Sequence, residues 1–205
     1  MSTPRSAAAQ AVAIAASPRI ETRPLRPDDR AGLAQLFERL SPESRYRRFF
    51  ELKRELKPRE LDWLTVVDHV DHEAIVAVDQ RDGSLVGVSR YVRDKDRPTS
   101  AELAIAVVDD RQRRGIGTVL VKEIVRRATA NGLEQLTAVA LGDNRPVHAL
   151  LRRLGFQVVG RSGREVELSL PLDRPDGIVV ALNPRPASPR GARATPRAAL
   201  PADAR

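Results

Sequence analysis

The stretch AELAIAVV (residues 101–108), followed by DDRQRRGIG (109–117), decides the fold of this chain. Its first eight residues are apolar apart from Glu102, which is the pattern of a buried strand. From Gly117 to Asn131, apolar residues recur at helical spacing with basic residues between them. The sequence therefore predicts a strand that leads into an amphipathic helix through a short turn rich in arginine and glycine.

Gly115 and Gly117 lie in the turn where this helix is predicted to begin. The first backbone amides of a helix have no acceptor within it, and the helix dipole adds partial positive charge there. Glycine lets the backbone approach a ligand closely, and Arg113 and Arg114 add positive charge beside it. These residues suit a cradle for phosphate oxygens, although a tight turn with solvated arginines has the same pattern. The spacing matches neither a P-loop nor a dinucleotide-binding motif.

Two motifs taken together resemble the GCN5-related N-acetyltransferase (GNAT) family. Val107, followed after four residues by QRRGIG (112–117), is similar to the loop that binds the pyrophosphate of acyl-CoA in that family. The segment NRPVHALLRRLGF (144–156) resembles the next motif, an asparagine that opens a helix ending in Leu-Gly-Phe. The two motifs have the expected order and separation, and the resemblance covers residues 20–171.

The resemblance implies an α/β fold of the GNAT type, a mixed and mostly antiparallel sheet with flanking helices and a splayed pair of parallel strands. It implies acetyl-CoA as co-substrate, with the pantetheine arm paired to strand backbone in the slot between those strands. A backbone amide of the central strand would polarise the thioester carbonyl. The residues that the resemblance assigns to acetyl-CoA are Ile105, Val107, Gln112, Arg113, Arg114, Gly115, Ile116, Gly117, Thr118 and Asn144.

Glu102 is the candidate general base. A protonated amine is not a nucleophile, so acyl transfer to an amine needs a group that takes its proton. Glu102 is the only acid in an otherwise apolar strand, and a buried carboxylate holds a proton more tightly than an exposed one. The alternative is a position at the exposed start of the strand, paired with an arginine. The lysine acetyltransferases that the chain resembles carry a glutamate at this strand position, which favours the base.

Leu151 departs from the pattern of the family. Many members place a tyrosine near this position to protonate the leaving thiolate, and leucine cannot donate a proton. Water, His148 or Tyr91 would have to substitute for it, or transfer would be slow.

The run LSPESRYRRFF (40–50) also resembles the acetyltransferase domain of bacterial protein-lysine acetyltransferases. We therefore predict an acetyl-CoA-dependent N-acetyltransferase that transfers an acetyl group directly to an amine. A protein lysine is the first hypothesis for this acceptor. A small amine such as an antibiotic or a polyamine is the second hypothesis, which an acidic acceptor cleft would favour. A non-catalytic acyl-CoA-binding protein is the third. We expect Tyr46, Phe49 and Phe50 to be core residues, and the role of the arginines among them stays open.

Residue patterning predicts the remaining elements. Asp28 or Asp29 would cap a helix with the apolar stripe Leu33, Leu36, Phe37 and Leu40. The other predictions are an edge strand (20–24), a helix capped by Ser41, a hairpin (74–79 and 85–92) that turns at Asp82-Gly83, a strand (136–141) parallel to 101–108, a helix capped by Asp143, and a final hairpin (156–160 and 165–170).

Composition narrows the class of protein. The chain has no cysteine, which is compatible with a reducing cytoplasm, and no apolar run approaches the ~20 residues of a membrane span. His69 and His72 have the spacing of metal ligands, but a loop fixes no ligand geometry and no third cluster supports them, so we predict no metal site. We predict a cytoplasmic protein.

The domain is expected to span residues 20–171, between a disordered leader (1–19) and a disordered Pro/Ala/Arg-rich tail (172–205). Five arginines and one aspartate in residues 184–205 supply half of the net charge of +8. No nucleic-acid reading motif or group of stacking aromatics accompanies this charge, so we predict neither a nucleic-acid nor a membrane partner.

Overall fold

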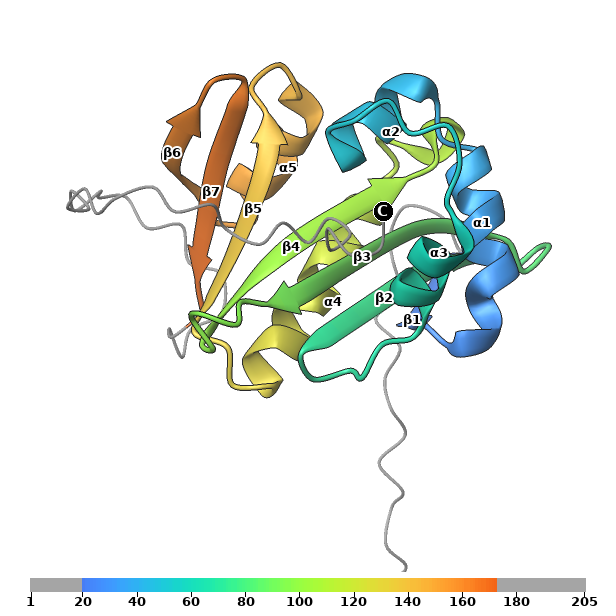
Figure 1. Ribbon diagram of the computed structural model, residues 1–205, viewed down its shortest axis with the longest axis horizontal. Helices are drawn as coiled ribbons and strands as arrows, with labels where there is room; N and C mark the ends of the chain where they lie inside the picture. Colours follow the sequence, from blue (N-terminus) through green and yellow to red (C-terminus); the bar gives the residue numbers. More distant parts are fainter. Residues whose placement is uncertain (1–19, 173–205) are drawn as a thin grey trace, which may run out of the picture.

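The structure is a computed structural model that describes residues 20–172, and these form a seven-stranded sheet with helices packed on it (Figure 1). The predicted leader (1–19) and nearly all of the predicted tail lie outside the described residues. The strands are β1 (Ile20–Pro24), β2 (His72–Asp79), β3 (Leu85–Arg93), β4 (Ser100–Val107), β5 (Gln135–Leu141), β6 (Gln157–Ser162) and β7 (Glu165–Pro171). The helices are α1 (Arg30–Glu38), α2 (Pro42–Phe49), α3 (Pro58–Thr65), α4 (Ile116–Ala130) and α5 (Arg145–Arg153), with short 3₁₀ helices η1 (Pro27–Asp29) and η2 (Asp109–Arg111).

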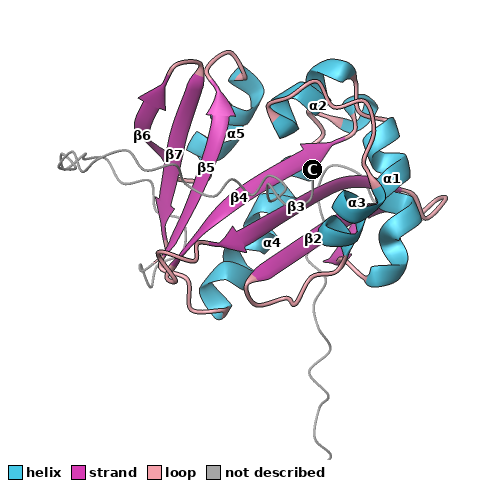
Figure 2. Cartoon of the chain, in the orientation of Figure 1, coloured by secondary structure: helices cyan, strands magenta, loops and turns pink. Residues whose placement is uncertain are grey.

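The sheet has the order β1-β2-β3-β4-β5-β7-β6, and all neighbours are antiparallel except β4 and β5. Helix α4 crosses between these two strands, as a parallel connection requires (Figure 2). The predicted mixed sheet with one parallel pair is confirmed. The predicted hairpin is also confirmed as β2–β3, and its turn residue Gly83 has a φ of 72°.

The parallel pair is short. Ser100, Ala101 and Glu102 of β4 lie opposite residues 135–137 of β5, and the two strands then part, β4 towards α2 and β5 towards α5 (Figure 1). Beyond Glu102, the edge of β4 that faces β5 has no partner strand within residues 20–172. The same is true of the edge of β5 that faces β4. Both edges therefore keep backbone donors and acceptors that no neighbouring strand uses.

The core lies between the sheet and the helices. Helix α4 packs on β2 and β3, and α1 packs on β3 and α3. The predicted apolar stripe on and after α1 is buried, and Phe37 makes an edge contact with Phe49 of α2 at 5.7 Å between ring centroids. No described helix combines the length and apolarity needed to cross a membrane.

The predicted caps of α1 and α2 have different outcomes. Asp29 precedes α1 but does not cap it, because its carboxylate accepts two hydrogen bonds from the guanidinium of Arg23, at 2.6 and 2.7 Å. A bidentate charged pair is stronger than a cap bond to a backbone amide. The prediction for Ser41 is confirmed, since its Oγ accepts a hydrogen bond from Ser44 N at 3.1 Å.

The prediction that Asp143 caps α5 is wrong. The cap is Asn144, whose Oδ1 accepts from Val147 N at 3.4 Å, while the exposed carboxylate of Asp143 lies 3.5 Å from Arg164. Helix α5 therefore begins one residue later than the sequence indicates, and Asn144 lies at its N-terminus.

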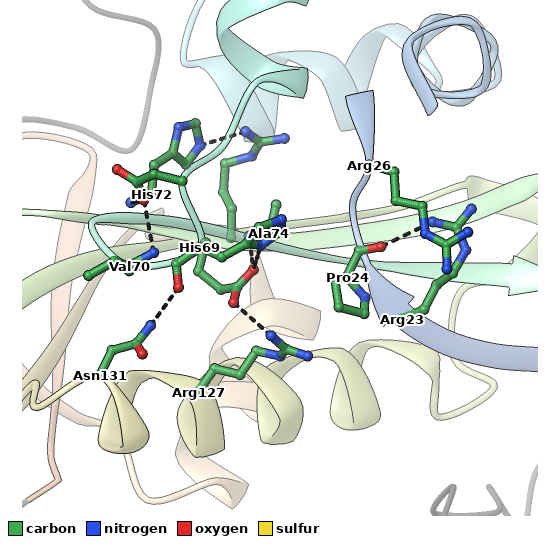
Figure 3. A network of polar contacts seen from close by, with 12 residues as sticks. Arg23, Pro24, Arg26, His69, Val70, His72, Ala74, Arg127 and Asn131 are labelled. Atoms are coloured by element: carbon green, nitrogen blue, oxygen red, sulfur yellow. Dashed lines mark hydrogen bonds and ion pairs between the residues drawn. The ribbon is translucent and has the colours of Figure 1, made fainter. Parts of the chain in front are cut away.

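The side chains of His69 and His72 contact different partners within one polar network (Figure 3). The Nδ1 atom of His69 lies 2.7 Å from Oε1 of Glu73, whose other oxygen accepts from Arg127 at 2.9 Å. The Nε2 atom of His72 lies 2.9 Å from Nη1 of Arg90. Burial, and then the positive charge of Arg90, lower the pKa of His72 to about 3. Among the described residues, no three His, Cys, Asp or Glu side chains gather in an arrangement that fits a metal ion.

Candidate functional site

A cleft of about 750 Å³ lies where β4 and β5 part. Residues 102–107 of β4 and 138–140 of β5 form its walls, together with side chains of α2 and α5. The turn after β4 closes one end. The unpaired edges of the two strands therefore face a space of the size that small-molecule sites have in proteins.

The glycine loop, residues 112–118, forms the electropositive end of this cleft. Gly115 precedes α4 with a φ of 84°, a left-handed conformation that glycine adopts without strain. The first helical hydrogen bond runs from Val119 N to Gly115 O at 3.2 Å. The amides of Ile116, Gly117 and Thr118 thus have no acceptor inside the helix, and the helix dipole adds to their partial positive charge.

Two further contacts hold the glycine loop in place. A Cβ atom at Gly117 would lie 3.1 Å from Cδ2 of Leu150, so the absence of a side chain there lets α4 approach α5 closely. The Nε2 atom of Gln112 donates to Val107 O at 3.0 Å and lies 3.4 Å from Ser44 Oγ. Gln112 therefore connects the loop to both the end of β4 and helix α2.

The structure brings most of the residues assigned to acetyl-CoA together in the cleft. Those that line it are Ile105, Val107, Gln112, Arg113, Gly115, Gly117, Thr118 and Asn144. Arg114 is exposed, and Ile116, the first residue of α4, is buried in the core, so neither belongs to the lining.

Asp109 fixes α2 against the glycine loop, a role that the sequence did not reveal. Its carboxylate accepts hydrogen bonds from Ser41 N and Ser41 Oγ, both at 2.9 Å, and from Ser44 Oγ at 2.8 Å. Burial raises the pKa of Asp109, but these hydrogen bonds outweigh it, so the pKa lies below its ordinary value. An acid directly after a buried strand was the only signal in the sequence, and it did not identify the partner.

Glu102 lies in β4 at the opposite end of the cleft from the glycine loop. Its side chain is buried, with 7% of the residue exposed, so the alternative of an exposed strand start is wrong. Among the described residues that line the cleft, it is the one carboxylate. The positive charge of Arg48 in α2 interacts with it.

The α2 side chains divide by role. Phe49 is buried as predicted, whereas Phe50 lines the cleft and Tyr46 is half-buried. Arg45 is structural, because it donates to the carbonyls of residues 38, 40 and 54 at 2.8 to 3.0 Å. Arg47 and Arg48 line the cleft.

The two proposed substitutes for a tyrosine acid lie elsewhere. Leu151 lines the cleft, as the tyrosine would. Tyr91 is fully buried outside that lining, and its hydroxyl donates to Val70 O at 2.9 Å. His148 also lies outside the lining, and its Nε2 donates to Leu141 O at 2.9 Å. Of the alternatives named for the missing tyrosine, His148 and Tyr91 therefore do not lie in the cleft lining.

Residues 33–156 match the model of a family described as the acetyltransferase (GNAT) family. The chain belongs to the GNAT family. The predicted N-acetyltransferase class is thereby confirmed, and so is the mixed sheet with a parallel pair as the GNAT fold. An acetyltransferase of Pseudomonas aeruginosa is 37% identical over 136 residues, which are 65% of this chain and 73% of that protein.

A second relative is the acetyltransferase Pat of Mycolicibacterium smegmatis, 32% identical over 133 residues, which are 65% of this chain and 40% of that protein. The crystal structure of the GNAT domain of S. lividans PAT covers 74% of this chain and 90% of its own, with a TM-score of 0.71 and 26% identity. A phosphinothricin acetyltransferase from Sinorhizobium meliloti, solved in complex with acetyl-CoA, has the same fold with a TM-score of 0.63 and 22% identity over 75% of this chain and 88% of its own.

Proposed function

We propose that this GNAT protein transfers the acetyl group of acetyl-CoA directly to an amine, with Glu102 as the general base. The observation that carries the proposal is the position of Glu102, a buried carboxylate in the wall of a cleft that the parted strands leave open. A general base must be close to the reacting amine and sheltered from bulk water, and Glu102 meets the second condition in the structure.

The cleft fits the three parts of acetyl-CoA. The pyrophosphate would accept hydrogen bonds from the free amides of the glycine loop, with Arg113 beside them. The pantetheine amides would pair with the backbone of Ile105 and Val107, where no strand of the described chain pairs with the β4 edge that faces β5. Asn144 lines the cleft near α5, where the resemblance puts the pantetheine. The acetyl-CoA complex of the fold neighbour from Sinorhizobium meliloti supports the same co-substrate.

A lysine that enters as the ammonium ion loses two protons in the reaction. Glu102 takes one of them and solvent takes the other, while the neutral nitrogen forms a bond to the thioester carbon and the carbon–sulfur bond breaks to release the CoA thiolate. Leu151 supplies no proton to the thiolate. The leaving group takes its proton from water, since among the described residues the cleft lining has no tyrosine, histidine or cysteine.

A protein lysine is the proposed acceptor. The similarity to the acetyltransferase Pat and to the GNAT domain of S. lividans PAT supports this choice. The charge of the cleft disfavours a polyamine, which carries several positive charges, because Glu102 is accompanied here by Arg47 and Arg48.

A second candidate acceptor is a small amine that also carries a carboxylate, as an amino acid does. The observation that favours it is the guanidinium of Arg48 beside Glu102, since arginine binds carboxylates well. The phosphinothricin acetyltransferase with the same fold is a neighbour of this type.

Isotope-labelled acetyl-CoA tests the proposal. The wild type, Glu102→Gln and the exposed control Glu134→Gln would each be incubated with cell lysate and labelled acetyl-CoA, and acetylated peptides would be mapped by mass spectrometry. We expect labelled lysines with the wild type and Glu134→Gln, and a loss of labelling of about a hundredfold with Glu102→Gln. Equal labelling by all three proteins would show that Glu102 is not the general base.

The small-amine candidate needs a second readout. Free CoA thiol would be measured with the same three proteins and a panel of amino acids and diamines. If thiol release depends on Glu102 but no lysines are labelled, the acceptor is a small amine and not a protein lysine. The absence of both signals would leave a protein that binds acetyl-CoA without using it.

A further inference from the structure

Phe50 ends helix α2 in a backbone conformation that phenylalanine rarely adopts. Its φ of 60° and ψ of 15° lie in the left-handed region, where the residue at the end of a helix is usually glycine or asparagine. For a bulky side chain this conformation costs free energy, because the Cβ atom crowds the backbone. Its amide donates to Tyr46 O at 2.8 Å. A glycine would make the same turn with less strain, so the turn itself does not explain a phenylalanine.

Backbone strain of this kind is concentrated at the cleft. Among residues 20–172, the residues other than glycine with a positive φ are Phe50, His69 and Arg113. Phe50 and Arg113 both line the cleft, whereas His69 contacts Glu73 in the polar network of β2. Residues held in sparsely populated backbone conformations cluster at active sites and ligand-binding positions. Arg113 already has a proposed ligand, the pyrophosphate of acetyl-CoA, and we therefore looked for a ligand of Phe50.

The neighbours of Phe50 place it at the end of the cleft that holds Glu102. Phe49 is buried in the core, whereas Phe50 is half-buried and lines the cleft. The charge of Arg48, which precedes both, interacts with Glu102. The first turn of α2 is bonded instead to Asp109 beside the glycine loop. The helix thus extends from the phosphate end of the cleft to the proposed base, and Phe50 lies at its second end.

Other elements supply the parts of the cleft that are assigned to acetyl-CoA. These parts are the glycine loop, the backbone of Ile105 and Val107 in β4, and Asn144 at the start of α5. Helix α2 lies beside the end of β4, and α5 lies beside β5, so the two helices flank the gap between the parted strands (Figure 1). A side chain at the end of α2 therefore belongs to the side of the cleft that the donor leaves open to the acceptor.

We propose that the ring of Phe50 binds the aliphatic chain of the acceptor lysine and so directs its amine to Glu102. This inference rests on the proposed acetyl transfer with Glu102 as the base. A lysine side chain has four methylene groups, which gain free energy on an apolar surface, and a polar end that needs polar partners. Phe50 offers the apolar surface and Glu102 the polar partner. A glycine at this turn would be less strained, but it would remove the surface.

The test compares two substitutions that both remove the ring and differ in backbone strain. Phe50→Ala keeps the strain and Phe50→Gly relieves it, so Phe50→Gly should melt about 2–4 °C above Phe50→Ala by circular dichroism. With saturating acetyl-CoA and Nα-acetyl-L-lysine methylamide as the acceptor, both variants should lower kcat/KM about tenfold. Their Kd for CoA, measured by calorimetry, should equal that of the wild type.

Two further variants complete the comparison. Phe50→Leu keeps a large apolar side chain, so its kcat/KM should stay within about twofold of the wild type. Leu52→Ala is the matched control, because Leu52 is an apolar residue of the segment after α2 that is 86% exposed and lies outside the cleft lining. Its kcat/KM should equal that of the wild type.

Three results would overturn the inference. If both Phe50→Ala and Phe50→Gly keep the wild-type kcat/KM, the ring does not bind the acceptor. If activity follows stability, so that only Phe50→Ala is impaired, Phe50 acts through the fold alone. If the loss appears in the Kd for CoA, the ring contacts the donor and not the lysine.

Failure of the proposed function has a different signature. If the wild type acetylates no amine, or if Glu102→Gln keeps wild-type turnover, the proposed reaction fails and this inference fails with it. If Glu102→Gln is inactive while both ring-deleting variants keep the wild-type kcat/KM, only the inference about Phe50 fails.

Discussion

Asp109 accepts two hydrogen bonds from Ser41, one from the backbone amide and one from the hydroxyl, both at 2.9 Å. This contact attaches the start of α2 to the turn after β4, and it is made by a carboxylate at the end of the strand that carries the proposed base. The position of α2, and therefore of Arg48, depends on it.

The first prediction concerns this attachment. Asp109→Asn should lower the free energy of unfolding by about 1–2 kcal/mol, because charged hydrogen bonds become neutral ones. KM for acetyl-CoA should rise about fivefold as the glycine loop loses its fixed partner. Asp110→Asn is the matched control, since Asp110 is exposed and its contacts with Arg39 and Arg111 are 3.3 and 3.4 Å long. Urea unfolding and initial rates that are equal for the two variants would contradict the prediction.

The glycine loop provides a second prediction with an internal control. Gly115 and Gly83 both have a positive φ, 84° and 72°, so alanine is strained at either position. Each substitution should cost about 1 kcal/mol of stability. Only Gly115→Ala should weaken binding of CoA, about tenfold by isothermal titration calorimetry, because only that residue shapes the phosphate cradle. A Gly115→Ala protein with wild-type affinity would show that the loop does not hold the pyrophosphate.

Leu151 allows a test of the missing acid. Leu151→Tyr and Leu151→Phe both enlarge a side chain that is 2% exposed, and each should cost about 1–3 kcal/mol of stability. The tyrosine variant differs only in a hydroxyl. If that hydroxyl protonates the leaving thiolate, kcat of Leu151→Tyr should exceed kcat of Leu151→Phe by about tenfold. Equal values would mean that protonation of the thiolate does not limit the rate.

The fourth prediction is a dependence of stability on pH. The pKa of His72 is about 3 in the folded chain and near its ordinary value of 6.5 in the unfolded chain. Between these values the unfolded chain binds the extra proton, so stability is full above the unfolded pKa and decreases as the pH falls. From about pH 7 to about pH 5 the loss of stability attributable to this group is about 2 kcal/mol.

His72→Gln isolates this contribution, since the glutamine amide oxygen can still accept from Arg90 but does not titrate. Urea unfolding at neutral pH and at about pH 5 would be compared for the two proteins, because other acidic groups titrate in both. The wild type should lose about 2 kcal/mol more than the variant over this interval. Equal losses would mean that His72 does not titrate differently in the folded state.

The sequence predicted the elements of the fold better than the contacts of the site. Strand 101–108, the glycine turn and the helix after it have strong periodicity and a distinctive turn, and all three are found. The caps at Asp29 and Asp143 were wrong because each acid has a choice of local partners, and Arg23 and Asn144 decided the outcome. Local patterns do not rank such competing partners.

The charge of the site could not be predicted from the sequence for another reason. Arg48 and Glu102 come from a helix and a strand that are distant in the chain, and their interaction depends on how α2 docks on the sheet. Glu102 was recognisable because it interrupts an apolar strand. The residues that surround it carry no such signature, since an arginine in an amphipathic helix is usually solvated.

The short pairing of β4 with β5 has a consequence for control of the enzyme. The unpaired strand edges would contact the pantetheine arm, which acetyl-CoA and CoA share, and not the acetyl group that distinguishes them. The product should then compete with the donor for the same slot with comparable affinity. The rate of acetylation would then depend on the ratio of acetyl-CoA to free CoA. It would depend much less on the total concentration of the two.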